Sequence, residues 1–308
     1  MQSFQKNPTA YFPLDYLIHL FEYLNKNTQY KIITYDDLCW QNFDDPEKQY
    51  PNEYKKWNEI KDKDKIYILF QHDVDSNPER TELLLKEEIR IGIKSNVMIF
   101  NKRVNRQELR EEKKLSYTSY NVNSNFLRLC QDKGFIIGYH LNAVEQSLHN
   151  LKLAEKIFRN DIKQLKKIYN IKYFSAHGGV RNKDNINNHS FRYKYQRDLI
   201  WVHNRISAKF EKTFSDGGIN NRNKWVDPES RSLIKFVKGM KPGKRYRILL
   251  HPQYYDKAIR QNKLLKKYNW YNEVVSYNYS TVNFFEAHLK HKNSFQVIKE
   301  MINNFFKL

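Results

Sequence analysis

Aspartates and histidines stand at the ends of apolar segments in this sequence. HDVD at 72–75 ends one apolar run, GYH at 138–140 and SAHGG at 175–179 end two more, and LLHP at 249–252 ends a fourth. A carboxylate and two imidazoles form a common ligand set for a catalytic divalent ion, whose open position can acidify water and polarise a carbonyl. The residue types therefore predict metal-assisted hydrolysis.

Asp73 and Asp75 lie two residues apart in the first of these segments. Side chains alternate along an extended chain, so both carboxylates point to the same side. One aspartate can hold a metal while the other takes a proton. Asp75, His140 and a further histidine would supply the three ligands. A single histidine at a strand end is more often structural, but several in one chain favour a shared site.

The elements expected to position these side chains alternate between strands and helices. Apolar runs predict buried parallel strands at 65–75, 95–100, 135–140, 173–179 and 247–252. Amphipathic patterns predict helices over 79–93, 125–134 and 144–169. The carboxyl ends of parallel strands surround the active site in α/β folds, so the polar residues that follow the strands are expected to meet.

The length of 308 residues is compatible with one large α/β core. We expect a catalytic domain over 65–260. Residues 1–64 would form an N-terminal extension packing on it, with a helix at 13–24 and a strand at 30–38. Residues 261–308 carry an amphipathic pattern and would form a C-terminal helical extension of the same domain.

The formal net charge of +20 raises the question of nucleic-acid binding. Such binding depends on clustered Lys and Arg that neutralise phosphates. The basic residues here are spread along the chain, which favours a solvated Lys-rich surface. Nucleic-acid binding is kept only as a weaker alternative.

The two cysteines, Cys39 and Cys130, form neither a CxxC pair nor a disulfide framework. That pattern is typical of a reducing compartment. The first residues do not read as a secretory signal, and no apolar run reaches the roughly 18 residues that a membrane span needs. The sequence thus predicts a cytoplasmic protein without a membrane span.

Five segments, taken in order, resemble the motifs of a known family. HDVDSNPE, GFIIGYH, YFSAHGG, FSDGGINNRNKW and LLHPQYY are similar to those of the polysaccharide deacetylases, the NodB-type family 4 carbohydrate esterases, in the branch that carries HDVD. The resemblance spans about 66–256. It implies a distorted (β/α) barrel that removes an acetyl group from an N-acetylated sugar of a surface glycan or its precursor. The expected metal is Zn²⁺, with other divalent ions as alternatives.

The resemblance also implies roles for individual residues. Asp73 would be the general base and His251 the general acid that protonates the leaving amine. Asp75 and His140 would bind the metal.

The third metal ligand needs a different source, because Val144 stands where the family has a second histidine. His177, at the next strand end, is the first choice. His149, within the predicted helix that follows His140, is the second.

Four further residues are expected to bind substrate. Asp216 and Trp225 belong to the fourth motif, and Arg181 would loosely replace an arginine of the third motif. Tyr254 could stack on a sugar, although a core position is equally compatible with its sequence context. Because the second histidine is missing, a glycan-binding or glycan-assembly protein with altered chemistry is the alternative function.

Overall fold

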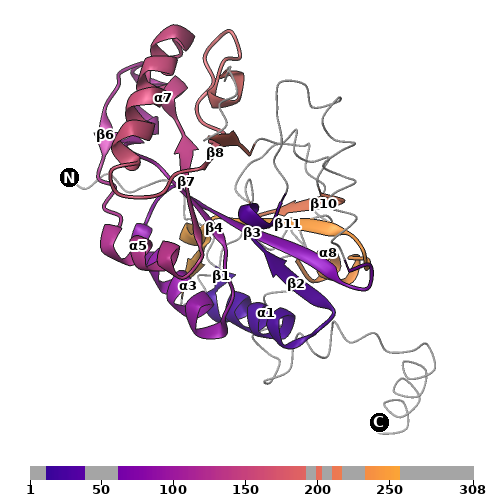
Figure 1. Cartoon of the computed structure of the whole chain (residues 1–308). Coiled ribbons are helices and arrows are strands. Elements are labelled where there is room, and N and C mark those ends of the chain that lie inside the picture. The colour runs from indigo at the N-terminus through magenta and orange to yellow at the C-terminus, as the bar shows by residue number, and fades with distance from the viewer. Residues whose placement is uncertain (1–11, 39–61, 192–198, 203–209, 217–232, 257–308) are drawn as a thin grey trace, which may run out of the picture.

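The computed structural model describes residues 12–38, 62–191, 199–202, 210–216 and 233–256. The helical extension expected at 261–308 lies outside these residues. The fold is a mixed α/β arrangement in which a parallel sheet curls into a half-barrel and helices cover its outer face (Figure 1).

The main sheet of the described residues has eight strands, in the order β10-β11-β3-β4-β7-β8-β9, with β2 beside β3. Every pair of neighbours in it is parallel. The strands are β2 (Tyr30–Ile33), β3 (Ile66–Val74), β4 (Asn96–Ile99), β7 (Ile136–Leu141), β8 (Tyr173–Ala176), β9 (Ile200–Trp201), β10 (Lys212–Ser215) and β11 (Arg245–Leu250). The predicted parallel strands are therefore confirmed.

Strand β3 is the centre of the sheet. All nine of its residues are buried. One edge pairs with β11, while the other pairs first with β2, over 66–69, and then with β4, over 71–74. A strand covered on both faces reads as a continuous apolar run, which explains why the sequence marks β3 so clearly.

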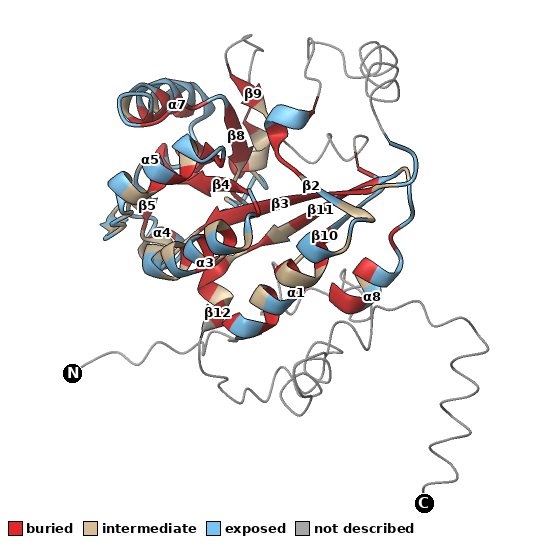
Figure 2. Cartoon of the chain, turned by 60° about the horizontal axis from the view of Figure 1, so that its bottom comes forward, coloured by how far each residue is buried: buried red, intermediate tan, exposed pale blue. Residues whose placement is uncertain are grey.

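The helices pack on the outside of the sheet with their apolar sides inward (Figure 2). They are α1 (Leu14–Lys26), α3 (Pro78–Ile91), α5 (Ser124–Asp132), α7 (Leu151–Leu165) and α8 (Leu233–Lys238). Two further short helices, α4 (Arg106–Glu111) and α6 (Ala143–Gln146), lie in the connections that follow β5 and β7. Phe21 of α1, for example, meets Phe70 of β3 edge-on, with ring centroids 4.8 Å apart. This packing gives the sheet a rigid outer layer.

The single helix predicted over 144–169 is wrong, because the chain turns between α6 and α7. Leu148 and His149 adopt left-handed φ values of 51° and 70°. Asn150 then caps α7, and its side chain accepts a hydrogen bond from the backbone N–H of Leu153. The apolar spacing continues across the turn, but Leu148 is 49% exposed rather than part of the core.

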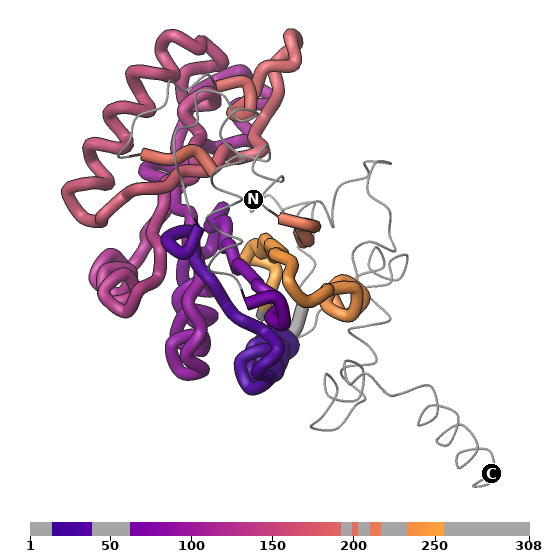
Figure 3. Tube along the Cα trace, turned by 45° about the vertical axis from the view of Figure 1, so that its right-hand side comes forward, coloured from indigo at the N-terminus to yellow at the C-terminus, as the bar shows by residue number. Residues whose placement is uncertain are grey.

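Short pairings complete the fold. The charged segment that follows β4 contains two short strands, β5 (Arg103–Val104) and β6 (Tyr117–Thr118), which pair antiparallel. In a separate two-stranded sheet, β1 (Phe12–Pro13) pairs with β12 (Tyr255–Asp256). The first and last described segments therefore lie side by side. Figure 3 draws the N-terminal part of the described chain in indigo and its C-terminal part in orange.

The described residues include no helix with the length and apolar character that a bilayer crossing requires.

Candidate active site

The carboxyl ends of β3, β7 and β8 bring four side chains together. Asp73 is the penultimate residue of β3, and Asp75 follows the strand directly. His140 is the penultimate residue of β7, and His177 comes directly after β8. Only β4 lies between β3 and β7, so these ends are close neighbours. The residues expected to form one site therefore do meet.

Asp75, His140 and His177 form a group that could hold a metal ion, with one ligand atom of each within 4.8 Å of the others. Asp75 Oδ1 lies 3.3 Å from Nε2 of His140 and 3.5 Å from Nε2 of His177. This oxygen is buried and has no hydrogen-bond partner in the described part of the chain. A buried carboxylate oxygen that accepts no hydrogen bond and lies between two imidazoles fits a divalent cation.

A hydroxyl on the neighbouring strand orients the His140 ring. His140 and Ser175 are partners in the β7–β8 register, and His140 Nδ1 lies 2.9 Å from Ser175 Oγ. Phe100 stacks on the same ring at a centroid distance of 5.1 Å. When Nδ1–H donates to the serine, Nε2 presents its lone pair to the site.

His177 has two competing neighbours at its other nitrogen. Nδ1 lies 3.1 Å from Glu145 Oε2 and 2.8 Å from Arg106 Nη2. A ring that donates Nδ1–H to Glu145 keeps Nε2 available for a metal. A ring that accepts from Arg106 carries its proton on Nε2 instead. Metal binding would therefore select the tautomer that Glu145 stabilises.

The electrostatics of the three candidate ligands agree with a cation site. Burial raises the pKa of Asp75, but His177, His140 and His251 outweigh it and hold that pKa well below its usual range. Burial lowers the pKa of His140, but Asp73 and Asp75 raise it overall. Burial and Arg106 lower the pKa of His177. The carboxylates thus favour positive charge here, which a proton or a metal can supply.

Asp73 lies beside this group with a different set of contacts. Its Oδ2 is 3.6 Å from His140 Nε2, and its Oδ1 accepts a 2.7 Å hydrogen bond from Gln71 Nε2. The two aspartates therefore point to the same side, as their spacing predicted. Among the described residues, Asp75 has a fully buried oxygen that accepts no hydrogen bond, and Asp73 has none of that kind.

His251 reaches the group from β11. Its Nε2 is 4.0 Å from Asp75 Oδ2, and its Nδ1 is 2.5 Å from Asp216 Oδ1. The buried Asp216 also accepts from the backbone N–H of His251 and from the hydroxyl of Tyr255. Burial lowers the pKa of His251, but Asp216 dominates and raises it to about 10. His251 therefore carries a proton at neutral pH.

The remaining expected residues have different positions. Tyr254 packs next to His251, with ring centroids 5.5 Å apart. Arg181 is exposed and donates to Asn185 Oδ1. His149 contacts the carbonyl of Val180, so the structure places it outside the cluster that contains His177.

Trp225 lies outside the described residues. Its expected role in binding substrate stays a prediction.

Sequence reasoning missed Glu145, Arg106 and Gln71. Glu145 and Arg106 reach His177 only through the packing of α4 and α6, and no local pattern marks them. Gln71 had a signal, because it precedes Asp73 by two residues on the same strand and therefore shares its face.

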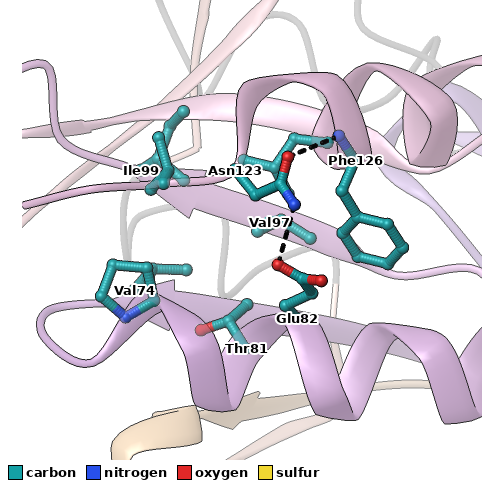
Figure 4. A pocket seen from close by; sticks show the side chains of 10 residues that line it. Val74, Thr81, Glu82, Val97, Ile99, Asn123 and Phe126 are labelled. Carbon is teal, nitrogen blue, oxygen red and sulfur yellow. Dashed lines mark hydrogen bonds between the residues drawn. The ribbon is translucent and has the colours of Figure 1, made fainter.

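A pocket lies between α3 and α5, and Val74 at the end of β3 is part of its lining (Figure 4). Its lining is mostly apolar. The carboxylate of Glu82 accepts from Asn123 and pairs with Lys86. With its charged group already engaged, this pocket does not compete with the strand ends as the place of chemistry.

The comparisons with known proteins give a distant likeness in the solved structures alone. No family model and no curated protein matches the chain. Among solved structures, the chain is similar to a family 4 carbohydrate esterase from Bacillus anthracis, with 14% sequence identity, 74% of this chain and 87% of that chain covered, and a TM-score of 0.26. At this level of similarity, the likeness assigns no function to this chain, and the side chains at the strand ends are the relevant observations.

Proposed function

We propose that the chain is a metal-dependent hydrolase that removes an acetyl group from an N-acetylated sugar of a surface glycan or its precursor. One observation carries the proposal. The buried Oδ1 of Asp75 lacks a hydrogen-bond partner among the described residues and faces Nε2 of both His140 and His177. Asp73 and His251 flank the same carboxylate.

Asp75, His140 and His177 would hold the ion. A bound Zn²⁺ would acidify water and polarise the acyl carbonyl. Glu145 and Ser175 keep the two imidazoles in the required orientation, through their contacts with the Nδ1 atoms.

Asp73 and His251 would move the protons. Asp73 Oδ2 accepts a proton from the water whose oxygen adds to the carbonyl carbon. His251 Nε2 donates its proton to the leaving nitrogen as the C–N bond breaks, which yields acetate and the free amine. The raised pKa of His251, to about 10, supports its role as the acid.

Acetate release tests the proposal. Protein stripped with a chelator and protein reloaded with Zn²⁺ would be incubated with N-acetylated and O-acetylated oligosaccharides. We expect release only from the reloaded protein, with N-acetylated sugars preferred.

Two outcomes would count against the assignment. Equal turnover before and after metal removal would contradict metal dependence. Zn²⁺ binding with no acetate release from any sugar would favour the glycan-binding alternative, which the absence of a histidine at Val144 motivates.

A further inference from the structure

The proposed base, Asp73, stands at the end of a buried row of hydrogen-bonding side chains that approaches it from inside the half-barrel. Gln71 Nε2 donates to Asp73 Oδ1 at 2.7 Å. Tyr35 Oη lies 2.5 Å from Gln71 Oε1. The guanidinium of Arg247 lies within hydrogen-bonding reach of the Tyr35 hydroxyl and acts to lower its pKa. All four residues are buried.

The direction of donation along this row follows from its two ends. Arg247 has only donors, so Tyr35 must accept from it and direct its own O–H at Gln71 Oε1. Burial raises the pKa of Tyr35 to about 12, so the phenol keeps its proton at neutral pH. The Gln71 amide is thereby fixed with its NH₂ group facing Asp73, whose carboxylate can only accept when ionised.

Tyr35 is itself held firmly in place. It begins the short helix η1 (Tyr35–Asp37), which follows β2. Its backbone N–H donates to Asn96 Oδ1 at 2.9 Å, and Asn96 Nδ2 donates to the carbonyl of Phe70 at 2.7 Å. The residues before the catalytic segment are thus joined to β3 and β4 directly beneath the site.

The row also distinguishes the two aspartates. Asp73 Oδ1 is occupied by an amide, whereas the nearby Asp75 Oδ1 has no partner in the described residues. A carboxylate held by a donor is less available as a ligand, while one without a donor gains most from a cation.

We propose that Arg247, Tyr35 and Gln71 form a positioning relay that holds Asp73 as the proton acceptor and leaves Asp75 to the metal. This inference rests on the proposed function, because it assigns a purpose to the relay within that reaction. Gln71 and Tyr35 act through Asp73 and are positioning residues. Through Tyr35, the segment that precedes β3 therefore helps to position the proposed base.

Two near-isosteric variants of Gln71 test the relay. Gln71→Met removes both polar groups, and Gln71→Glu keeps the contact with Tyr35 but places an acceptor where the donor was. In each we expect kcat to fall about 10- to 100-fold, with KM changed less than about twofold and Zn²⁺ affinity retained. Having two variants keeps the test valid if one fails to fold.

A double-mutant cycle tests whether Tyr35 acts through Gln71. Tyr35→Phe should lower kcat about 2- to 10-fold in the wild-type background and have no further effect in Gln71→Met. The matched control is Tyr173→Phe. The Tyr173 ring packs on Tyr35 with centroids 5.3 Å apart, but its hydroxyl donates to Asp36 Oδ1 instead. We expect this control to keep wild-type kcat.

The outcomes separate the relay from the reaction. Wild-type acetate release combined with full kcat in Gln71→Met would overturn the relay and leave the proposed function intact. Equal effects of Tyr35→Phe in both backgrounds would also overturn it. A wild-type protein that binds Zn²⁺ but releases no acetate would contradict the proposed function, and the relay's catalytic purpose with it.

Discussion

Near the carboxyl end of β3, the two faces of the strand have different surroundings. His72 points outward, where its Nε2 lies 2.7 Å from Glu88 Oε1, and both side chains are fully buried. Ser95 Oγ donates to the other oxygen of Glu88 at 2.6 Å. Asp73 points inward and faces the candidate metal ligands. Neighbouring residues of one motif are therefore separated by the sheet.

This difference shows that a short polar motif need not place all of its polar residues in the site. HDVD contains three polar residues, but alternation along the strand delivers only Asp73 and Asp75 to the site. His72 contributes to the packing of α3 on the sheet. The outward face should therefore control stability and the inward face turnover, which the following variants test.

Asp73→Asn should have the largest effect on activity. The asparagine keeps an oxygen for Gln71 to contact but removes the proton acceptor, so we expect kcat to fall about 10²- to 10⁴-fold. Zn²⁺ binding and the urea unfolding midpoint should change little. Asp64→Asn, the same substitution at an exposed position, is the control. Unchanged acetate release from Asp73→Asn would refute its role as base.

His72→Leu should have the largest effect on stability. It leaves the buried carboxylate of Glu88 without its imidazole partner, which we expect to cost about 3–5 kcal/mol in urea unfolding. Turnover per folded molecule should be retained.

The double variant His72→Leu/Glu88→Leu should recover most of that loss, because an apolar pair replaces both buried polar side chains. If folded His72→Leu protein loses Zn²⁺ or turnover, the separation of the two faces fails.

Glu145→Gln should lower the Zn²⁺ affinity although Glu145 is not a candidate ligand. The amide oxygen accepts from His177 Nδ1–H more weakly than a carboxylate, so we expect Zn²⁺ affinity to fall about 10- to 100-fold. Competition with a chelating dye would measure this. Glu112→Gln on the exposed surface serves as the control. Equal affinities in the two variants would show that Glu145 does not tune the site.

Glu155→Ala should have the smallest effect and tests a region outside both faces of β3. Glu155 pairs with Arg159 one turn later on α7, with the two side chains 54% and 62% exposed. Such pairs contribute less than about 0.5 kcal/mol, and less still at high salt. We expect unchanged turnover, and a stability loss comparable to that of His72→Leu would show that burial is not the deciding factor.

Sequence patterns predicted much of the fold because burial on both faces leaves a continuous apolar run. β3, β4, β7, β8 and β11 were all expected. The helix predicted over 144–169 was wrong, because an apolar period of 3.6 residues does not reveal a left-handed turn at Leu148 and His149.

The strand pattern alone indicates which side chains stand at strand ends, and hence that Asp73, Asp75, His140 and His177 would meet at one edge of a parallel sheet. The position of His177 rather than His149 beside Asp75 and His140, and the contact between Asp216 and His251, follow from the packing of distant elements. The two kinds of information differ in their range along the chain. Strand period and burial act between near neighbours in the chain, whereas Glu145, Tyr35 and Asp216 reach their partners only after distant elements pack together.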